Sequence, residues 1–329
     1  CYRQNEEPIR KHTIHKDENG NIKISNIKIP GVRKGTAAAF TPEREKEVEG
    51  HILEQYWKRA EEIEYQQLID TGTIATGKPR ANSKPLHTRT VYKIKFKPDN
   101  VTIDKFKCRI VVLGFQALAG VHYNPQATSA PVARGSTFMM LIAVALEQNL
   151  VLKQADVKGA YLLSKIDKDI DIRLPRSKRL HKLLTGLYGL KQAGYLWNEK
   201  FDKVLTNMGF VKSTNDECLY VLKRGDEVCY IAIWVDDILA AVSSEKLWEE
   251  LYAKLNKECP STQGELKYLL GMKITQTHNT NEGRRVHVCQ EPKIDSLLDQ
   301  MDMLGCNPVS TPMMVKVPTA TNCPKTEEA

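Results

Sequence analysis

The chain has 329 residues, of which 41% are hydrophobic, enough for about two domains with buried cores. No apolar run approaches the ~20 residues that a membrane-spanning helix needs, so we expect no contact with a membrane. The eight cysteines include no C-x-x-C pair, which argues against a zinc site and favours reduced thiols in a reducing compartment. The first residue is Cys1 rather than Met, and we expect a piece of a longer protein.

The net charge of +8 is concentrated in one segment. Between Lys78 and Arg109, ten basic residues are interrupted by only two acidic ones, so this segment alone carries +8. A local excess of this kind is typical of a protein that binds a phosphate-bearing partner. The alternative at this point is a solvated, lysine-rich face without a ligand.

The N-terminal part contains few regular patterns. Residues 1–50 are mostly polar with scattered glycines, and we expect a loosely structured linker. Helix signals begin near Pro42 and continue to Leu68, and residues 71–88 are predicted to be a loop.

A pair of alternating segments follows, and it predicts a β-hairpin. Residues 91–97 and 105–110 alternate between apolar and basic side chains, and Pro98-Asp99-Asn100 between them indicates a turn. If the apolar faces of the two strands pack together, six cations line a single surface: Lys93, Lys95, Lys97, Lys105, Lys107 and Arg109. This arrangement favours phosphate binding over a random distribution of charge.

The rest of the chain mixes helices and strands without a strict βαβ rhythm. Helices are predicted at 137–148, 191–208, 244–258 and 292–303, and strands at 151–157, 169–174, 219–222, 228–235, 238–242, 269–274 and 286–288. The tail after Cys306 is rich in Pro and Thr and is predicted to be unstructured. The interspersed pattern indicates an α+β fold.

Three aspartates are candidates for metal binding. Asp236 and Asp237 interrupt about eighteen residues that are mostly apolar, and Asp156 ends another apolar strand. Aspartates also make ordinary hairpin turns and helix caps, so each has a simple structural explanation. Adjacent carboxylates close to a core, however, repel each other unless a cation neutralises them, and Mg²⁺ is the natural ion for an all-oxygen site. Two metals that hold the oxygens of a phosphoryl transfer require carboxylates from at least two strands.

Seven blocks of this sequence, in order, resemble the reverse transcriptase of copia-type LTR retrotransposons. They are Lys107–Phe115, Ala130–Arg134, Gln154–Leu162, Leu187–Trp197, Trp234–Asp237, Gly264–Met272 and Cys306–Pro312. The resemblance extends from about Trp57 to Pro312. Trp234 stands where the family usually has Tyr, and a Glu that is common before Thr128 is missing, but no catalytic carboxylate is lost.

The resemblance implies a role for each matching residue. Asp156 and Asp236 would be the principal metal ligands, and Asp237 would complete the acidic site. Lys107 and Arg109 would grip a nucleoside triphosphate. Two further positions match nucleotide contacts of the family: Tyr161 would lie under the incoming sugar and exclude a 2′-hydroxyl, and Gln192 would pack beside the nucleotide and the template.

The resemblance also implies a right-hand polymerase fold. Fingers are expected at 51–150, the palm at 151–260, a partial thumb or connection at 261–315, and a disordered tail at 316–329. The implied activity is that of an RNA-directed DNA polymerase that uses two Mg²⁺ ions, with Mn²⁺ as a substitute, to extend a primer.

The expected partners are an RNA and DNA primer–template and deoxynucleoside triphosphates, together with self-association or contacts to other parts of a polyprotein. The expected compartment is a cytoplasmic retrotransposon particle or the nucleus. Two alternatives stay open: a catalytically decayed, element-derived nucleic-acid-binding protein, and a metal-dependent nuclease.

Overall fold

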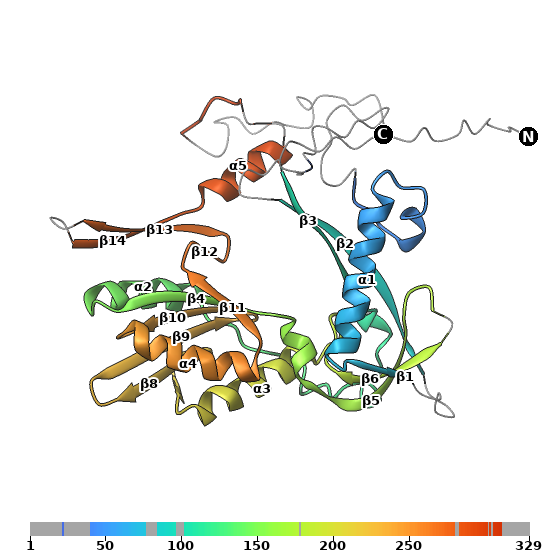
Figure 1. Cartoon of the computed structure of the whole chain (residues 1–329), viewed down its shortest axis with the longest axis horizontal. Helices are drawn as coiled ribbons and strands as arrows, with labels where there is room; N and C mark the ends of the chain where they lie inside the picture. The colour runs from blue at the N-terminus through green and yellow to red at the C-terminus, as the bar shows by residue number, and fades with distance from the viewer. Residues whose placement is uncertain are drawn as a thin grey trace, which may run out of the picture. The chain divides into compact units, whose positions relative to one another are not determined.

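A computed structural model describes residues 22, 40–76, 84–96, 102–177, 179–279, 283–301, 303 and 305–310. The chain divides into two compact units, Cys1–Glu265 and Leu266–Ala329. Figure 1 shows that helices and strands are interspersed along the chain, so the predicted α+β class is confirmed. Within the described residues, no helix is both long enough and apolar enough to cross a membrane, and the six described cysteines are free thiols.

A five-stranded sheet and a long helix form the first part of the larger unit. The strand order is β1-β6-β5-β2-β3, with bounds β1 Ile74–Thr76, β2 Leu86–Phe96, β3 Ile103–Val112, β5 Lys165–Arg173 and β6 Leu180–Thr185. Helix α1, Glu54–Asp70, packs on β3. Its buried residues are Trp57, Ala60, Glu64 and Leu68, whose spacing of three and four residues places them on one face.

Two expectations for this region were wrong. The predicted helix from Pro42 begins at Glu54, after a short 3₁₀-helix η3 at Glu45–Glu47, because Gly50 has a φ of 77° and breaks the helical path. The predicted loop at 71–88 contains β1 and the start of β2. The partner of β1 is β6, more than one hundred residues away, so local patterns do not reveal the pairing.

A six-stranded sheet forms the second part of this unit. Its order is β11-β4-β10-β9-β8-β7, with bounds β4 Val151–Val157, β7 Val211–Lys212, β8 Leu219–Arg224, β9 Glu227–Trp234, β10 Asp237–Val242 and β11 Ser261–Glu265. Three helices pack around it: α2 Gly135–Glu147, α3 Ala193–Asn207 and α4 Glu245–Glu258.

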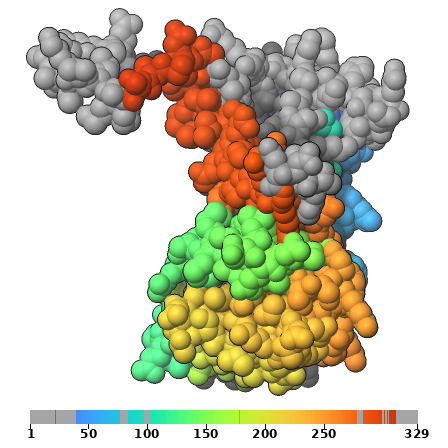
Figure 2. Space-filling model, turned by 90° about the vertical axis from the view of Figure 1, so that its left-hand side faces the viewer, coloured from blue at the N-terminus to red at the C-terminus, as the bar shows by residue number. Residues whose placement is uncertain are grey.

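The central strands of this sheet are buried because helices cover both of its faces. Figure 1 shows α2 on one side of the sheet and α4 on the other, and in Figure 2 the green segment with α2 lies against the yellow segment with β8 and β9. Residues 238–242 of β10 are all buried. The sequence predicts either Ser243 or Ser244 as the cap of α4, and it is Ser244 that accepts a hydrogen bond from the Leu247 amide at 3.2 Å.

The smaller unit contains a three-stranded sheet and one helix. The strands are β12 Tyr268–Leu269, β13 Met272–Asn279 and β14 Gly283–Cys289, and α5 at Glu291–Gln300 contacts β13. The predicted single strand at 269–274 was wrong, because Leu270 and Gly271 have φ values of 50° and 79° and form a tight turn between β12 and β13. The predicted tail at 316–329 lies outside the described residues.

Candidate active site

Two of the three predicted aspartates lie directly opposite each other on neighbouring strands. β4 and β10 pair antiparallel, and the register places Asp156 opposite Asp237. Such residues project from the same face of a sheet, with Cβ atoms ~4.5–5.5 Å apart. Lys153, on the other face of β4, forms an ion pair of 2.7 Å with Glu245 at the start of α4. The two aspartates therefore lie on the face away from α4.

Asp236 lies in the turn that joins β9 to β10. Trp234 pairs with Asp237, which leaves Val235 and Asp236 as a two-residue loop. Val235 has a φ of 56°, a left-handed conformation that a β-branched residue rarely adopts. Because the local sequence disfavours this conformation, contacts from the rest of the fold must impose it.

Two hydrogen bonds hold the strained turn. The indole Nε1 of Trp197 on α3 donates to the Val235 carbonyl oxygen at 2.7 Å. The Val157 amide at the end of β4 donates to the Asp236 carbonyl oxygen at 2.9 Å. Together these bonds fix the turn to α3 and to the strand that carries Asp156.

The three carboxylates repel each other. Burial, followed by the charges of Asp236 and Asp156, raises the pKa of Asp237 to about 6. Burial and the charge of Asp236 also raise the pKa of Asp156. A bound cation would relieve this repulsion.

The chemistry of this donor set fits a divalent cation. Carboxylate oxygens are hard ligands that suit Mg²⁺, which keeps water and substrate oxygens as its other ligands. Within the described part of the chain, no three His, Cys, Asp or Glu side chains gather closely enough to hold an ion by themselves. Asp156 and Asp237 form the close pair, and Asp236 acts on both through its charge.

The predicted β-hairpin is confirmed. β2 and β3 pair antiparallel, with Lys93 opposite Lys107, Lys95 opposite Lys105, and Val91 opposite Arg109. The basic residues therefore share one face, which we call the basic face: Lys93, Lys95, Lys105, Lys107 and Arg109. Tyr92, Ile94, Cys108 and Ile110 are buried on the other side. Lys97 lies outside the described residues.

The basic face acts electrostatically on the aspartates. The charges of Lys95, Lys107 and Lys105 lower the pKa of Asp156, against the larger effect of burial. Burial and the neighbouring cations Arg109, Lys95 and Lys105 lower the pKa of Lys107. An anion between the basic face and the aspartate site would relieve the repulsion among the cations.

An aromatic pair connects the basic face to the aspartates. The guanidinium of Arg109 lies over the Tyr188 ring at 4.7 Å from its centroid, and Tyr188 contacts Tyr161 edge-on at 5.3 Å between centroids. Burial and the charge of Asp236 raise the pKa of Tyr161. The fold therefore brings Arg109, Tyr161 and the acidic turn into one neighbourhood.

Two residues of this neighbourhood, Tyr188 and Thr262, were not predicted from the sequence. Tyr188 belongs to the block Leu187–Trp197 that carries the family resemblance, and this was the one signal for it. Thr262 on β11 pairs with Asp156 on the side opposite to Asp237. No local pattern marks Thr262, because its position depends on a strand pairing across more than one hundred residues.

Gln192 is placed differently from the other predicted site residues. Its side chain is 1% exposed, and its Nε2 donates to the His122 carbonyl oxygen at 2.7 Å and to Asp167 Oδ1 at 3.3 Å. The amide nitrogen is therefore engaged by protein acceptors. A contact between Gln192 and a nucleotide stays a prediction.

Comparison with known proteins identifies relatives over most of the chain. The family model described as reverse transcriptase (RNA-dependent DNA polymerase) matches residues 74–315. The chain is 29% identical over 298 residues to the retrovirus-related Pol polyprotein from transposon TNT 1-94 of Nicotiana tabacum, covering 87% of this chain and 22% of the relative. It is 27% identical to the corresponding polyprotein from transposon RE1 of Arabidopsis thaliana, covering 94% of this chain and 21% of the relative.

A solved structure of a foamy viral protease-reverse transcriptase in complex with double-stranded DNA also matches, with a TM-score of 0.37 and 15% identity over 73% of this chain and 36% of that one. The chain spans about a fifth of the two transposon polyproteins. The predicted resemblance to a copia-type retrotransposon polyprotein is confirmed, and the chain belongs to the reverse transcriptase (RNA-dependent DNA polymerase) family.

Proposed function

We propose that this chain catalyses RNA-directed DNA synthesis, with Asp156, Asp236 and Asp237 as the metal-binding carboxylates. The observation that carries the proposal is the electrostatic coupling of two surfaces within one unit. The Asp156 carboxyl on β4 is acted on both by Asp236 and by the lysines of the β2–β3 hairpin. In a triphosphate–metal complex, the phosphates carry the negative charge that the basic face lacks, and the metal ions carry the positive charge that the aspartate site lacks.

Each part of the site has a specific task in this proposal. The basic face binds the triphosphate, and the Arg109 guanidinium keeps its orientation through its contact with Tyr188. Tyr161 lies beneath the sugar and discriminates against ribonucleotides. The three aspartates would hold two Mg²⁺ ions, and these ions would supply positive charge that stabilises the negative charge developing in the nucleotidyl transfer.

The remaining site geometry positions these groups. The turn that carries Asp236 is fixed by Trp197 and Val157, so its carboxylate needs little reorganisation when substrate binds.

We assign the five-stranded sheet and α1 to the fingers and the six-stranded sheet with α2, α3 and α4 to the palm. This assignment departs from the bounds that the sequence suggests, fingers at 51–150 and palm at 151–260. β5 and β6 lie within the predicted palm but belong to the sheet of the fingers, α2 lies within the predicted fingers but packs on the palm sheet, and β11 extends the palm sheet beyond residue 260.

Primer extension on an RNA template with Mg²⁺ tests the proposal directly. The parent chain should add deoxynucleotides to a DNA primer, and Asp236→Asn should not, while both bind the primer–template equally well in a filter or fluorescence assay. Because duplex is held mainly through its phosphates, binding should weaken steeply as salt rises.

The same experiment distinguishes the two alternatives. Binding without extension by the parent chain would contradict catalysis and favour a decayed nucleic-acid-binding protein. Hydrolysis without extension would favour a metal-dependent nuclease, which has no need for Tyr161 or the basic face. Localisation to a retrotransposon particle and self-association stay predictions beside this proposal.

A further inference from the structure

Strand β3 forms an open edge of the five-stranded sheet, because the strand order ends at β3. Amides that point outwards from such an edge need acceptors from outside the sheet. Two of these acceptors lie directly after Arg109 along the strand. The Val112 amide donates to the Tyr188 carbonyl oxygen at 2.7 Å, and the Ile110 amide donates to Glu64 Oε1 at 3.0 Å. Both bonds therefore hold β3 immediately beside a cation of the basic face.

Glu64 lies on the buried face of α1, where a carboxylate is unusual. The residue is 6% exposed, although burial of a carboxylate costs free energy unless the group is paired. Burial raises the pKa of Glu64, whereas the Ile110 amide and the charges of Arg109 and Lys107 lower it. All of these favourable interactions come from β3, so the carboxylate is tied to this strand in particular.

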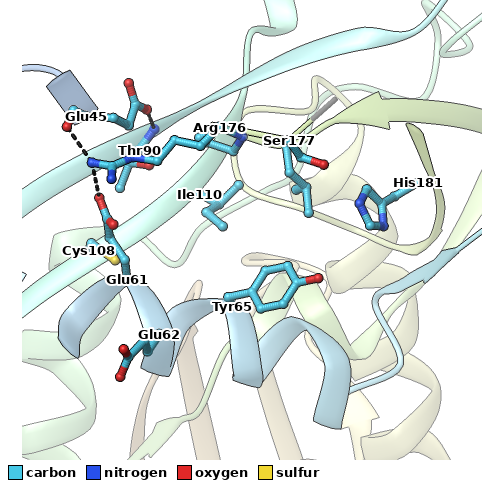
Figure 3. A pocket seen from close by; sticks show the side chains of 12 residues that line it. Glu45, Glu61, Glu62, Tyr65, Thr90, Cys108, Ile110, Arg176, Ser177 and His181 are labelled. Atoms are coloured by element: carbon cyan, nitrogen blue, oxygen red, sulfur yellow. Dashed lines mark hydrogen bonds and ion pairs between the residues drawn. The ribbon is translucent and has the colours of Figure 1, made fainter. Parts of the chain in front are cut away.

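Packing supplies only part of the support that β3 receives at this point. A cavity of about 410 Å³ lies behind the basic face, between η3, α1, β2, β3 and the segment after β5, and Thr90, Cys108 and Ile110 border it. Figure 3 shows these side chains on the strand side of the cavity, with Tyr65 of α1 across from them. Atoms that line a cavity lack packing partners on one side. The position of β3 therefore depends more strongly on the hydrogen bonds at its edge.

The neighbouring strand is held in a similar way. Within the described strands, β2 pairs with β5 only near its start, so the Thr90 amide also lies at an open edge. This amide, opposite Ile110, donates to Glu45 Oε1 at 2.6 Å. Two carboxylates thus cap the same residue pair from opposite edges. Of the two, Glu64 caps the strand that carries Arg109, whereas Glu45 caps β2.

We propose that Glu64 is a positioning residue for the basic face, because its hydrogen bond fixes β3 beside Arg109. This inference rests on the proposed function, in which the basic face binds a triphosphate. The bond from the Ile110 amide sets where the strand lies relative to α1. The strand in turn keeps the Arg109 guanidinium over the Tyr188 ring, at 4.7 Å from its centroid. Glu64 acts through the backbone and does not itself touch the substrate.

Two substitutions separate the acceptor oxygen of Glu64 from its charge. Glu64→Gln removes the charge but keeps a carbonyl oxygen at the same reach, whereas Glu64→Asp keeps the charge on a side chain that is one methylene shorter. The probe is inorganic tripolyphosphate, titrated calorimetrically into the full chain in Mg²⁺-free buffer. Glu64→Asp should raise the Kd roughly tenfold, in line with loss of a hydrogen bond to a charged acceptor, and Glu64→Gln should stay within about twofold of the parent chain.

Ala60→Gly is the matched control for a loss of helix stability. Ala60 lies on the buried face of α1, one turn before Glu64, and glycine weakens the helix without removing the acceptor, so the Kd should not change. If thermal unfolding shows that Glu64→Asp does not fold, Glu64→Met takes its place. Methionine is a good helix former that lacks the acceptor, and it should raise the Kd to the same extent.

Several outcomes would overturn the proposal. A loss of affinity in Glu64→Gln that equals or exceeds the loss in the shortened variant would show that the acceptor oxygen is not what matters. An unchanged Kd when the acceptor is removed, an equal loss in Ala60→Gly, or no binding of tripolyphosphate by the parent chain would also contradict it. The titration needs neither primer nor template. A parent chain that binds tripolyphosphate but does not extend a primer would therefore contradict the proposed function, while the variants would still decide the role of Glu64.

Discussion

The aspartate site and the basic face both hold like charges close together, but the fold treats them differently. On β4 and β10, Asp156 and Asp237 are opposite each other beside a helix-covered sheet, and the pKa of both is raised. On β2 and β3, lysines are also paired directly across the strands, yet Lys93, Lys95 and Lys105 remain exposed. Solvent weakens the repulsion among the lysines, whereas partial burial maintains it among the aspartates.

This difference indicates distinct roles for the two surfaces. The aspartates are held rigidly by strand pairing and by the Trp197 contact, which suits chemistry that requires fixed ligand positions. The lysines are long, exposed side chains on a two-stranded ribbon, which suits capture and release of a charged substrate. We therefore expect variants of the aspartates to affect the rate of the chemical step and variants of the lysines to affect substrate binding.

The largest effect is expected for Asp156→Asn. Loss of this carboxylate should reduce the rate of nucleotide incorporation by about a thousandfold or more, because metal ions contribute several kcal/mol to stabilising the transition state. Asp226→Asn is the matched control, since Asp226 lies in the exposed turn between β8 and β9, at the opposite end of β9 from Asp236. A comparable loss in the control would show that the effect is structural.

The next largest effect is a change in the free energy of unfolding with pH, measured in metal-free buffer. The pKa of Asp237 is raised from 3.8 to about 6 in the folded state. Between these values the folded state binds more protons than the unfolded state, so the free energy of unfolding should fall as pH rises from 4 to 6, by of order 2–3 kcal/mol for a full shift.

Denaturant unfolding of the parent chain and of Asp237→Asn at several pH values isolates this contribution. The variant should be the more stable protein above pH 6, and the difference should vanish near pH 4. Mg²⁺ that binds only the folded state should restore stability to the parent chain. An unchanged difference across the pH range would contradict the raised pKa.

A smaller effect is expected for Lys107→Gln on the basic face. The KM for deoxynucleoside triphosphates should rise roughly tenfold, by about 1.4 kcal/mol, with little change in kcat, and its dependence on salt should weaken. Lys223→Gln is the matched control, because Lys223 is an exposed lysine on β8 in the other sheet. If kcat fell while KM stayed constant, Lys107 would belong with the aspartates rather than with the substrate-binding surface.

The smallest effect is expected for Trp197→Phe. This change keeps an aromatic ring but removes the hydrogen bond to the Val235 carbonyl, so kcat should fall roughly fivefold, in line with a net hydrogen-bond contribution of about 1 kcal/mol. Trp57→Phe removes a comparable bond, from Nε1 to the Phe40 carbonyl oxygen at 3.3 Å, far along the chain from the acidic turn. Equal losses of activity in both variants would argue against a role for Trp197 in positioning the turn.

Much of the local structure could be predicted from sequence patterns. Alternation with a period of two predicted the β2–β3 hairpin and the shared face of its cations, because side chains alternate strictly across a strand. The cap of α4 was predicted at Ser243 or Ser244, and the structure places it at Ser244. The errors at Gly50 and Leu270 arose where backbone with positive φ interrupts a segment that otherwise has the composition of a helix or a strand.

The sequence by itself determined which residues can carry charge, which faces are apolar, and that the blocks of a reverse transcriptase occur in order. Only the tertiary structure decided that Asp156 pairs with Asp237, that Arg109 rests on Tyr188, and that a cavity lies behind the basic face. These contacts join residues that are about eighty positions apart or more, and their pairing depends on the burial of whole sheets rather than on any local preference.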